Sequence, residues 1–157
     1  MNAPPVNEVK TIEAYREALR PVLDRHADAI RGKIEAALAA LPEKTRRFEI
    51  GIHPAQDYEG DFGIWIHLDG PDLYVLNKAI APHRDLFSVR SRAGWTEGVP
   101  IFEPDDDQPF DVNDAIVDIV GDWLIELWVT IERPAGTPPA SVFGEEGWGT
   151  KPVRDLP

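Results

Sequence analysis

Two stretches of alternating residues constrain the fold of this chain most strongly. In each, an apolar residue faces one side at every second position, and these residues are Phe48, Ile50, Ile52, Phe62, Ile64, Ile66 and Leu68. The segment HPAQDYEGD between the two stretches has the composition of a turn. Alternation with a period of two is typical of a strand with one buried face. The sequence therefore predicts an antiparallel hairpin whose aliphatic face packs against helices.

The residues before this hairpin predict a helix or a helical hairpin. Apolar residues recur at helical spacing from Ile12 to Leu41, and Thr11 suits the N-cap position. Pro21 either kinks this segment or begins a second helix, because an interior proline costs ~3 kcal/mol. Residues 1–7 are expected to be a frayed tail.

The residues after the hairpin predict two more strands and then a long helix. A turn at residues 69–72 leads into LYVLNKAI (73–80), Leu86–Arg90 form the next strand, and together they favour a meander of about four strands. Residues 111–128 have helical spacing with Asp111 as N-cap, which favours a long acidic amphipathic helix. Residues 122–132 also alternate with period two, so a shorter helix followed by a strand is the rival interpretation.

The predicted fold class is α+β, with residues 1–157 as a single domain. Residues 134–157 contain five prolines and four glycines, which predicts an irregular C-terminal strap anchored by residues such as Trp148. The chain has no cysteine, which excludes disulfides and thiolate metal sites. Its N-terminus lacks the apolar core of a signal peptide, and no run reaches the ~18 apolar residues of a membrane span. We therefore expect a cytoplasmic protein without a membrane partner.

Negative charge is concentrated in one quarter of the chain. Residues 93–132 contain eleven acidic residues and neither lysine nor arginine, against a formal net charge of −12 for the whole chain. Such a field attracts basic surfaces and repels nucleic acid. The residues expected to bind a basic protein partner are Asp105, Asp106, Asp107, Asp111, Asp114, Asp118, Asp122 and Glu126.

The spacing of the acidic residues in the predicted helix indicates where this binding surface would lie. Asp114, Asp118, Asp122 and Glu126 are each four residues apart, which aligns like charges along one ridge of the helix. The alternative is that basic residues from elsewhere in the chain, such as Arg46, fold over the ridge and neutralise it. The charge pattern alone does not decide between the two.

A second candidate site lies on the other face of the predicted hairpin. Pairing of its strands places His53, Trp65 and His67 on one face, where two imidazoles could bind a ligand or metal or do acid–base chemistry. Their spacing matches no metal motif, and the chain contains no phosphate-cradling loop, nucleophile elbow or HExxH pair. Asp105-Asp106-Asp107 lacks the alternating oxygens and the glycine of a calcium loop. We predict no catalytic residue, metal or cofactor.

Three segments carry a resemblance to a known family. The chain resembles a bacterial domain-of-unknown-function family in GPDLYVLNKAI (70–80), DVNDAIVDIVGDWLIELW (111–128) and EEGWGT (145–150). That resemblance implies no activity and transfers no functional residue. In size, acidity and lack of catalytic motifs the chain is also similar to immunity proteins, which neutralise bacterial toxins. The leading hypothesis is therefore a non-enzymatic binding protein that occludes a basic surface, most specifically an immunity protein. The alternative is a small enzyme or ligand-binding protein that uses the histidine face.

Overall fold

A five-stranded mixed sheet organises the computed structural model, which describes residues 9–103 and 108–157. The strand order is β3-β2-β1-β6-β7, with bounds β1 (Arg47–Pro54), β2 (Phe62–Asp69), β3 (Asp85–Ser88), β6 (Ala140–Gly144) and β7 (Val153–Leu156). A separate ribbon pairs β4 (Arg90–Ser91) with β5 (Gly94–Trp95). The helices are α1 (Ile12–Arg25), α2 (Ala27–Ala39), α3 (Leu73–Ala79) and α4 (Val112–Trp128), with short 3-10 turns η2 (Ala81–His83) and η3 (Glu145–Gly147).

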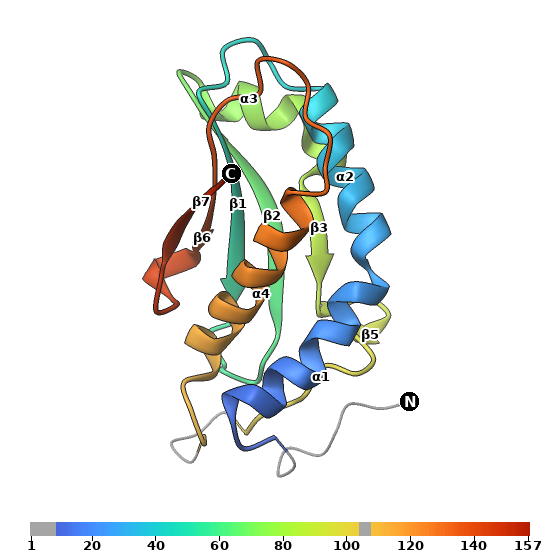
Figure 1. Cartoon of the computed structure of the whole chain (residues 1–157), viewed down its shortest axis with the longest axis vertical. Helices are drawn as coiled ribbons and strands as arrows, with labels where there is room; N and C mark the ends of the chain where they lie inside the picture. The colour runs from blue at the N-terminus through green and yellow to red at the C-terminus, as the bar shows by residue number, and fades with distance from the viewer. Residues whose placement is uncertain (1–8, 104–107) are drawn as a thin grey trace.

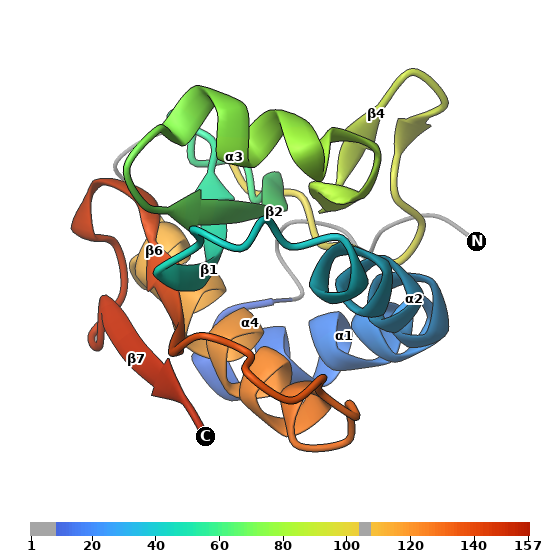
Figure 2. The ribbon, with the colours of Figure 1, turned by 90° about the horizontal axis from the view of Figure 1, so that it is seen from above.

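Helices cover one face of the sheet, and the opposite face is partly open. Figure 1 shows α1, α2 and α4 in front of the strands, and Figure 2 shows α3 on the other side of the sheet. The predicted hairpin is confirmed: β1 and β2 pair antiparallel, with Phe48 opposite Leu68 and Ile52 opposite Ile64. Their aliphatic side chains are buried under the helices. Each such side chain contributes ~1.5–3 kcal/mol to folding, which fixes the register of the hairpin.

The N-terminal helices break at a different residue from the one that the sequence suggests. Pro21 lies inside α1, with its ring exposed, and the chain remains helical as far as Arg25. His26 then ends α1 and begins α2, with φ −101° and ψ 3°. Thr11 caps α1 as predicted, since its hydroxyl oxygen accepts a hydrogen bond from the amide of Ala14.

The prediction of a strand at residues 73–80 is wrong, because this segment forms α3. Asp72 caps the helix by accepting a hydrogen bond from the amide of Val75. The Asn77 side chain donates to the carbonyl oxygen of Leu68 and accepts from the amide of the same residue, which ties α3 to the end of β2. Capping and this contact outweigh the strand propensity of the apolar residues.

The prediction of an irregular tail is also wrong in part, because residues 140–144 and 153–156 are strands β6 and β7. β6 pairs in parallel with β1, with Ile50 opposite Val142, so the sheet is mixed rather than a meander. Pro139 precedes β6 and Pro152 precedes β7, and their carbonyl oxygens accept hydrogen bonds from the amides of Phe48 and Gly144. The two strands widen the sheet beneath α4.

Residues 122–128, for which helix and strand were both open, belong to α4. Asp111 caps this helix by accepting a hydrogen bond from the amide of Asp114. Twelve of its residues are buried, because the helix packs against α1 and against β1, β6 and β7 of the sheet. Within the described part of the chain, no helix has the length and apolarity needed to cross a membrane.

Candidate functional site

The carboxylates along α4 bind other parts of the same chain. Asp114 accepts a hydrogen bond from the amide of Gly149 at 2.7 Å, and Asp118 accepts from the amide and hydroxyl of Thr150 at 3.0 and 2.9 Å. Asp122 pairs with Arg154 at 2.5 Å, and Glu126 pairs with Arg20 at 2.8 Å. The acidic side of α4 therefore fastens the β6–β7 arm to the helix.

Gly121 makes room for this fastening. A Cβ atom at Gly121 would lie 1.9 Å from Nη2 of Arg154, whose guanidinium therefore lies directly on the helix backbone. The same nitrogen donates to the carbonyl oxygen of Asp118 at 3.3 Å. The glycine that lowers the helical propensity of this segment is thus the residue that lets Arg154 reach Asp122.

A different set of carboxylates gathers at the end of the molecule where β1 turns into β2. We define the acidic end as three segments, as far as the structure describes them: residues 55–61, residues 102–103 with 108–114, and residues 144–150. Hydrogen bonds join them: Asn113 donates to the carbonyl oxygen of Ala55, Gln56 donates to Glu146, and Asp114 accepts from Gly149. The segments contain no lysine or arginine. Their acidic residues in the described part are Asp57, Glu59, Asp61, Glu103, Asp111, Asp114, Glu145 and Glu146. The predicted site residues Asp105, Asp106 and Asp107 lie outside the described residues.

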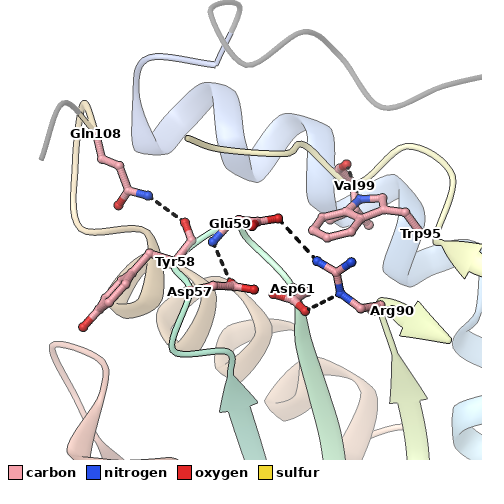
Figure 3. A network of polar contacts seen from close by, with 8 residues as sticks. All are labelled: Asp57, Tyr58, Glu59, Asp61, Arg90, Trp95, Val99 and Gln108. Carbon is pink, nitrogen blue, oxygen red and sulfur yellow. Dashed lines mark hydrogen bonds and ion pairs between the residues drawn. The ribbon is translucent and has the colours of Figure 1, made fainter. Parts of the chain in front are cut away.

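One arginine is built into the acidic end from the neighbouring ribbon. Figure 3 shows Arg90 between Asp61 and Glu59, to which it donates at 2.9 and 3.4 Å, with its guanidinium 5.0 Å from the ring of Trp95. In the same view, Gln108 donates to the carbonyl oxygen of Tyr58 at 2.6 Å. These bonds fix the turn after β1, and Arg90 neutralises part of the charge of Asp61 and Glu59.

Two aromatic side chains lie among these carboxylates. Tyr58, which is 37% exposed, contacts Trp148 edge to face, with their ring centroids 5.6 Å apart. Tyr58 and Glu146 are also the only residues other than glycine with positive φ in the described chain, at 60° and 57°. Such backbone conformations cost about 1–3 kcal/mol each and cluster at functional sites. The strain at the acidic end is therefore confined to the two facing turns.

The structure brings the predicted histidine face together on the open side of the sheet. Nε2 of His53 lies 3.0 Å from Nε2 of His67. Nδ1 of His53 lies 2.7 Å from the Glu145 carboxylate, and Nδ1 of His67 lies 3.2 Å from Nη2 of Arg84. Trp65, which is 42% exposed, stacks on His53 with their ring centroids 4.7 Å apart.

Gly51 allows the two imidazoles to meet. It lies between them on β1, and a Cβ atom there would lie 2.7 Å from Nε2 of His53 and 3.0 Å from Cδ2 of His67. The same atom would lie 2.8 Å from the ring of Phe143 on β6. The histidine pair therefore occupies a depression in the sheet that the missing side chain creates.

The partners of the four ring nitrogens assign the protons. Arg84 is always a donor, so Nδ1 of His67 must present a lone pair and Nε2 of His67 must carry the proton. That proton is donated to Nε2 of His53, whose own proton on Nδ1 is then donated to Glu145. Each donor meets one acceptor. A metal ion held by both Nε2 atoms would require the opposite tautomer of His67, and no group of three potential metal ligands occurs among the described residues.

Burial, with smaller contributions from the neighbouring His53 and Arg84, lowers the pKa of His67 to about 4, whereas Glu145 acts in the opposite direction. The neutral form of His67 that the hydrogen bonds require is thus the form that the site favours. Hydrogen bonds therefore run continuously from Arg84 through both imidazoles to Glu145.

Several residues of both sites escape sequence reasoning. Glu145 and Arg84 are 92 and 17 residues from the histidines to which they bond, and only the sheet brings them there. Glu145 follows β6, whose pairing with β1 puts Gly144 opposite Ile52, one residue from His53. The one sequence signal near Glu145 is the segment EEGWGT, whose glycines and tryptophan indicate a turn of defined conformation.

Comparison with known proteins places the chain in a family without assigning it an activity. The profile of a family described as "Family of unknown function (DUF6389)" matches residues 10–155, nearly the whole chain. No curated protein and no solved structure matches.

Proposed function

Since the chain belongs to the DUF6389 family, whose function is unknown, we propose its role from the site: it binds a basic protein partner through the acidic end. The supporting observation is that three segments distant in sequence converge there with eight carboxylates and no lysine or arginine of their own. Most specifically, the partner is a bacterial toxin, and the protein is its immunity protein.

The proposal moves the predicted binding surface from the side of α4 to its N-terminal end. Asp118, Asp122 and Glu126 are occupied by the chain's own Thr150, Arg154 and Arg20. The arginines neutralise Asp122 and Glu126, and Thr150 covers Asp118. Asp111, Asp114 and Glu146 accept from the uncharged amides of Asp114, Gly149 and Gln56 and keep their negative charge. Asp111 and Asp114 also belong to the acidic end, where Glu103, Glu146 and Asp57 are exposed beside them.

Charge and aromatic surface supply different parts of the interaction. Uncompensated carboxylates accelerate encounter with a basic surface, and this effect weakens as ionic strength rises. Tyr58 and Trp148 supply rigid aromatic area, the kind of residue that dominates binding energy at interfaces and that also attracts guanidinium groups. Pre-set backbone conformations at Tyr58 and Glu146 would hold this surface ready before the partner arrives.

The chemistry of the partner follows from this surface. A nuclease toxin has a positive groove for phosphates, and carboxylates of the acidic end would occupy the positions of those phosphates. The chain between Glu103 and Gln108 carries three further aspartates, which add to the charge available. Inhibition then requires no catalysis, only occlusion of the groove.

Charge reversal separates this proposal from a general effect of acidity. The test variant is Glu103→Lys with Glu146→Lys, both exposed at the acidic end. The matched control is Glu35→Lys with Glu43→Lys, which makes the same change of charge on α2 and the turn after it, also at exposed positions. Wild-type protein and both variants, each with a photo-crosslinker at Tyr58, are used to capture partners from the source cell at low and at high salt.

We expect a basic protein that crosslinks at Tyr58, is captured by the control variant, and is lost in the Glu103/Glu146 variant and at high salt. Co-expression of the wild type or the control variant should relieve the toxicity of that protein, and co-expression of the Glu103/Glu146 variant should not. Equal capture by both variants would refute the role of the acidic end. A captured partner that is not toxic would support the binding surface but refute the immunity role.

A further inference from the structure

The histidine pair has a property that follows from its hydrogen bonds alone. In the neutral pair the donors run in one direction, from Arg84 to His67, from His67 to His53, and from His53 to Glu145. Within the pair, Nε2 of His53 is the one ring nitrogen that accepts a ring proton. We propose that this pair is a proton-operated switch, in which uptake of one proton detaches Arg84 from His67.

The argument rests on counting protons over four ring nitrogens. The neutral pair carries two, on Nδ1 of His53 and Nε2 of His67. A third proton from solvent leaves one nitrogen unprotonated, and it must be one of the two Nε2 atoms, since a single N–H lies between them. Whichever imidazole carries the charge, Nδ1 of His67 becomes a donor. It then faces Nη2 of Arg84, another donor, and that bond is lost.

The other contacts of the pair survive the added proton. His53 keeps its hydrogen bond to Glu145, which gains strength when the imidazole is charged. The hydrogen bond between the two Nε2 atoms persists as well. The change is therefore confined to the Arg84 end of the chain, where two hydrogen-bond donors now face each other. The strand pairing also puts other charged residues on this sheet face: Glu49 opposite His67, Arg47 opposite Asp69, Asp85 opposite Trp65, and Asp155 opposite Ser141.

The surroundings of Arg84 can accommodate its guanidinium after the bond to His67 is lost. Its Nε donates to the carbonyl oxygen of Ile66 at 2.9 Å, so the stem of the side chain stays anchored. The guanidinium also borders a shallow groove beside α3, lined by Leu73, Tyr74, Asn77, Lys78, Ala81 and Arg84 itself. Once Nη2 is released from His67, the Arg84 guanidinium is available in this groove as a second cation beside Lys78. The lowered pKa of His67 means that this ring itself binds a proton only in the acid range.

Histidine nitrogen spectra test the switch directly. Full-length protein labelled with ¹⁵N is titrated from neutral pH to about pH 4, with long-range proton–nitrogen correlations that identify the protonated nitrogens of each ring. We expect Nδ1 protonated in His53 and Nε2 protonated in His67 at neutral pH. On acidification Nδ1 of His67 should gain a proton, in step with loss of the slowly exchanging guanidinium signal of Arg84.

Arg84→Met and its matched control Arg92→Met, an exposed arginine of the small ribbon, isolate the role of the guanidinium. Without Arg84, Nδ1 of His67 meets no competing donor, and the midpoint of the His67 titration should rise by roughly 0.5–1 pH unit. Arg92→Met should leave it unchanged. Nδ1 protonation of His67 at neutral pH in the wild type would overturn the proposal. So would equal midpoints in the two variants, because Arg84 would then play no part in the titration.

Discussion

Arg154 lies across Gly121 and pairs with Asp122, the next residue of α4, so the β6–β7 arm packs against the helix at a residue without a side chain. The contact explains a glycine in the middle of a helix and assigns a structural task to the acidic side of α4. Because of this contact, the effect of a substitution at Gly121 should depend on whether Arg154 is present.

Gly121→Ala tests this dependence. Alanine favours the helix by about 1 kcal/mol over glycine, but its Cβ displaces the guanidinium and its bonds to Asp122 and Asp118. We expect a small net change or a loss of stability in the wild-type background. In an Arg154→Ala background, the same substitution should stabilise the protein by about 1 kcal/mol. Urea unfolding of the four variants measures the coupling, and equal effects in both backgrounds would show that Arg154 does not occupy the site.

Asp118 offers a second test of the arm. Asp118→Ala removes the acceptor for the amide and hydroxyl of Thr150 and should cost about 1–2 kcal/mol, whereas Asp118→Asn keeps one carbonyl oxygen and should cost less. Hydrogen exchange at the amide of Thr150 should accelerate in the alanine variant. Unaltered exchange there would mean that Asp118 does not hold the arm.

Gly51→Ala should disturb the histidine pair. Its Cβ would meet both imidazoles and Phe143 within 3.0 Å on a central strand that cannot move away, and such overpacking costs about 1–3 kcal/mol. Gly63→Ala, on the same face of β2, is the matched control, because its nearest neighbour is the Trp65 ring nitrogen at 3.2 Å. Thermal unfolding and histidine spectra should show a larger effect at Gly51. A larger effect at Gly63 would contradict the packing described.

His67 should make stability depend on pH in the acid range. Its pKa is about 4 in the folded protein and 6.5 when the chain is unfolded, so between these values the unfolded state binds more protons. The free energy of unfolding should therefore fall as pH drops from about 6.5 to 4 and be independent of this group above 6.5. The contribution is on the order of 1 kcal/mol, allowing for solvent screening of a half-buried ring.

The measurement is denaturant unfolding at a series of pH values for wild type and His67→Gln. Both proteins share every carboxylate, so the difference between their curves isolates His67. The difference should shrink as the pH falls towards 4. A constant difference across the range would show that protonation of His67 is not linked to folding.

The amino-acid pattern alone predicts those helices and strands in which the spacing of apolar residues reflects burial of one face. The β1–β2 hairpin follows from alternation at Phe48–Leu68, and the cap at Asp111 and the apolar spacing after it predict α4. The concentration of acidic residues is likewise a property of the sequence. The histidine face followed from the hairpin, because strand pairing fixes which side chains share a side.

Tertiary structure decided what those side chains contact. β6 is short and follows two prolines, Pro138 and Pro139, so nothing local distinguishes it from a loop. Its partner β1 lies some ninety residues away in sequence. That pairing brings Glu145 to His53 and gives the α4 carboxylates their partners in the arm. α3 illustrates the same limit, since apolar residues that suit a strand became helical once Asn77 could bond the end of β2. Local periodicity encodes which face is buried, whereas the partners of polar groups depend on contacts that only the complete fold creates.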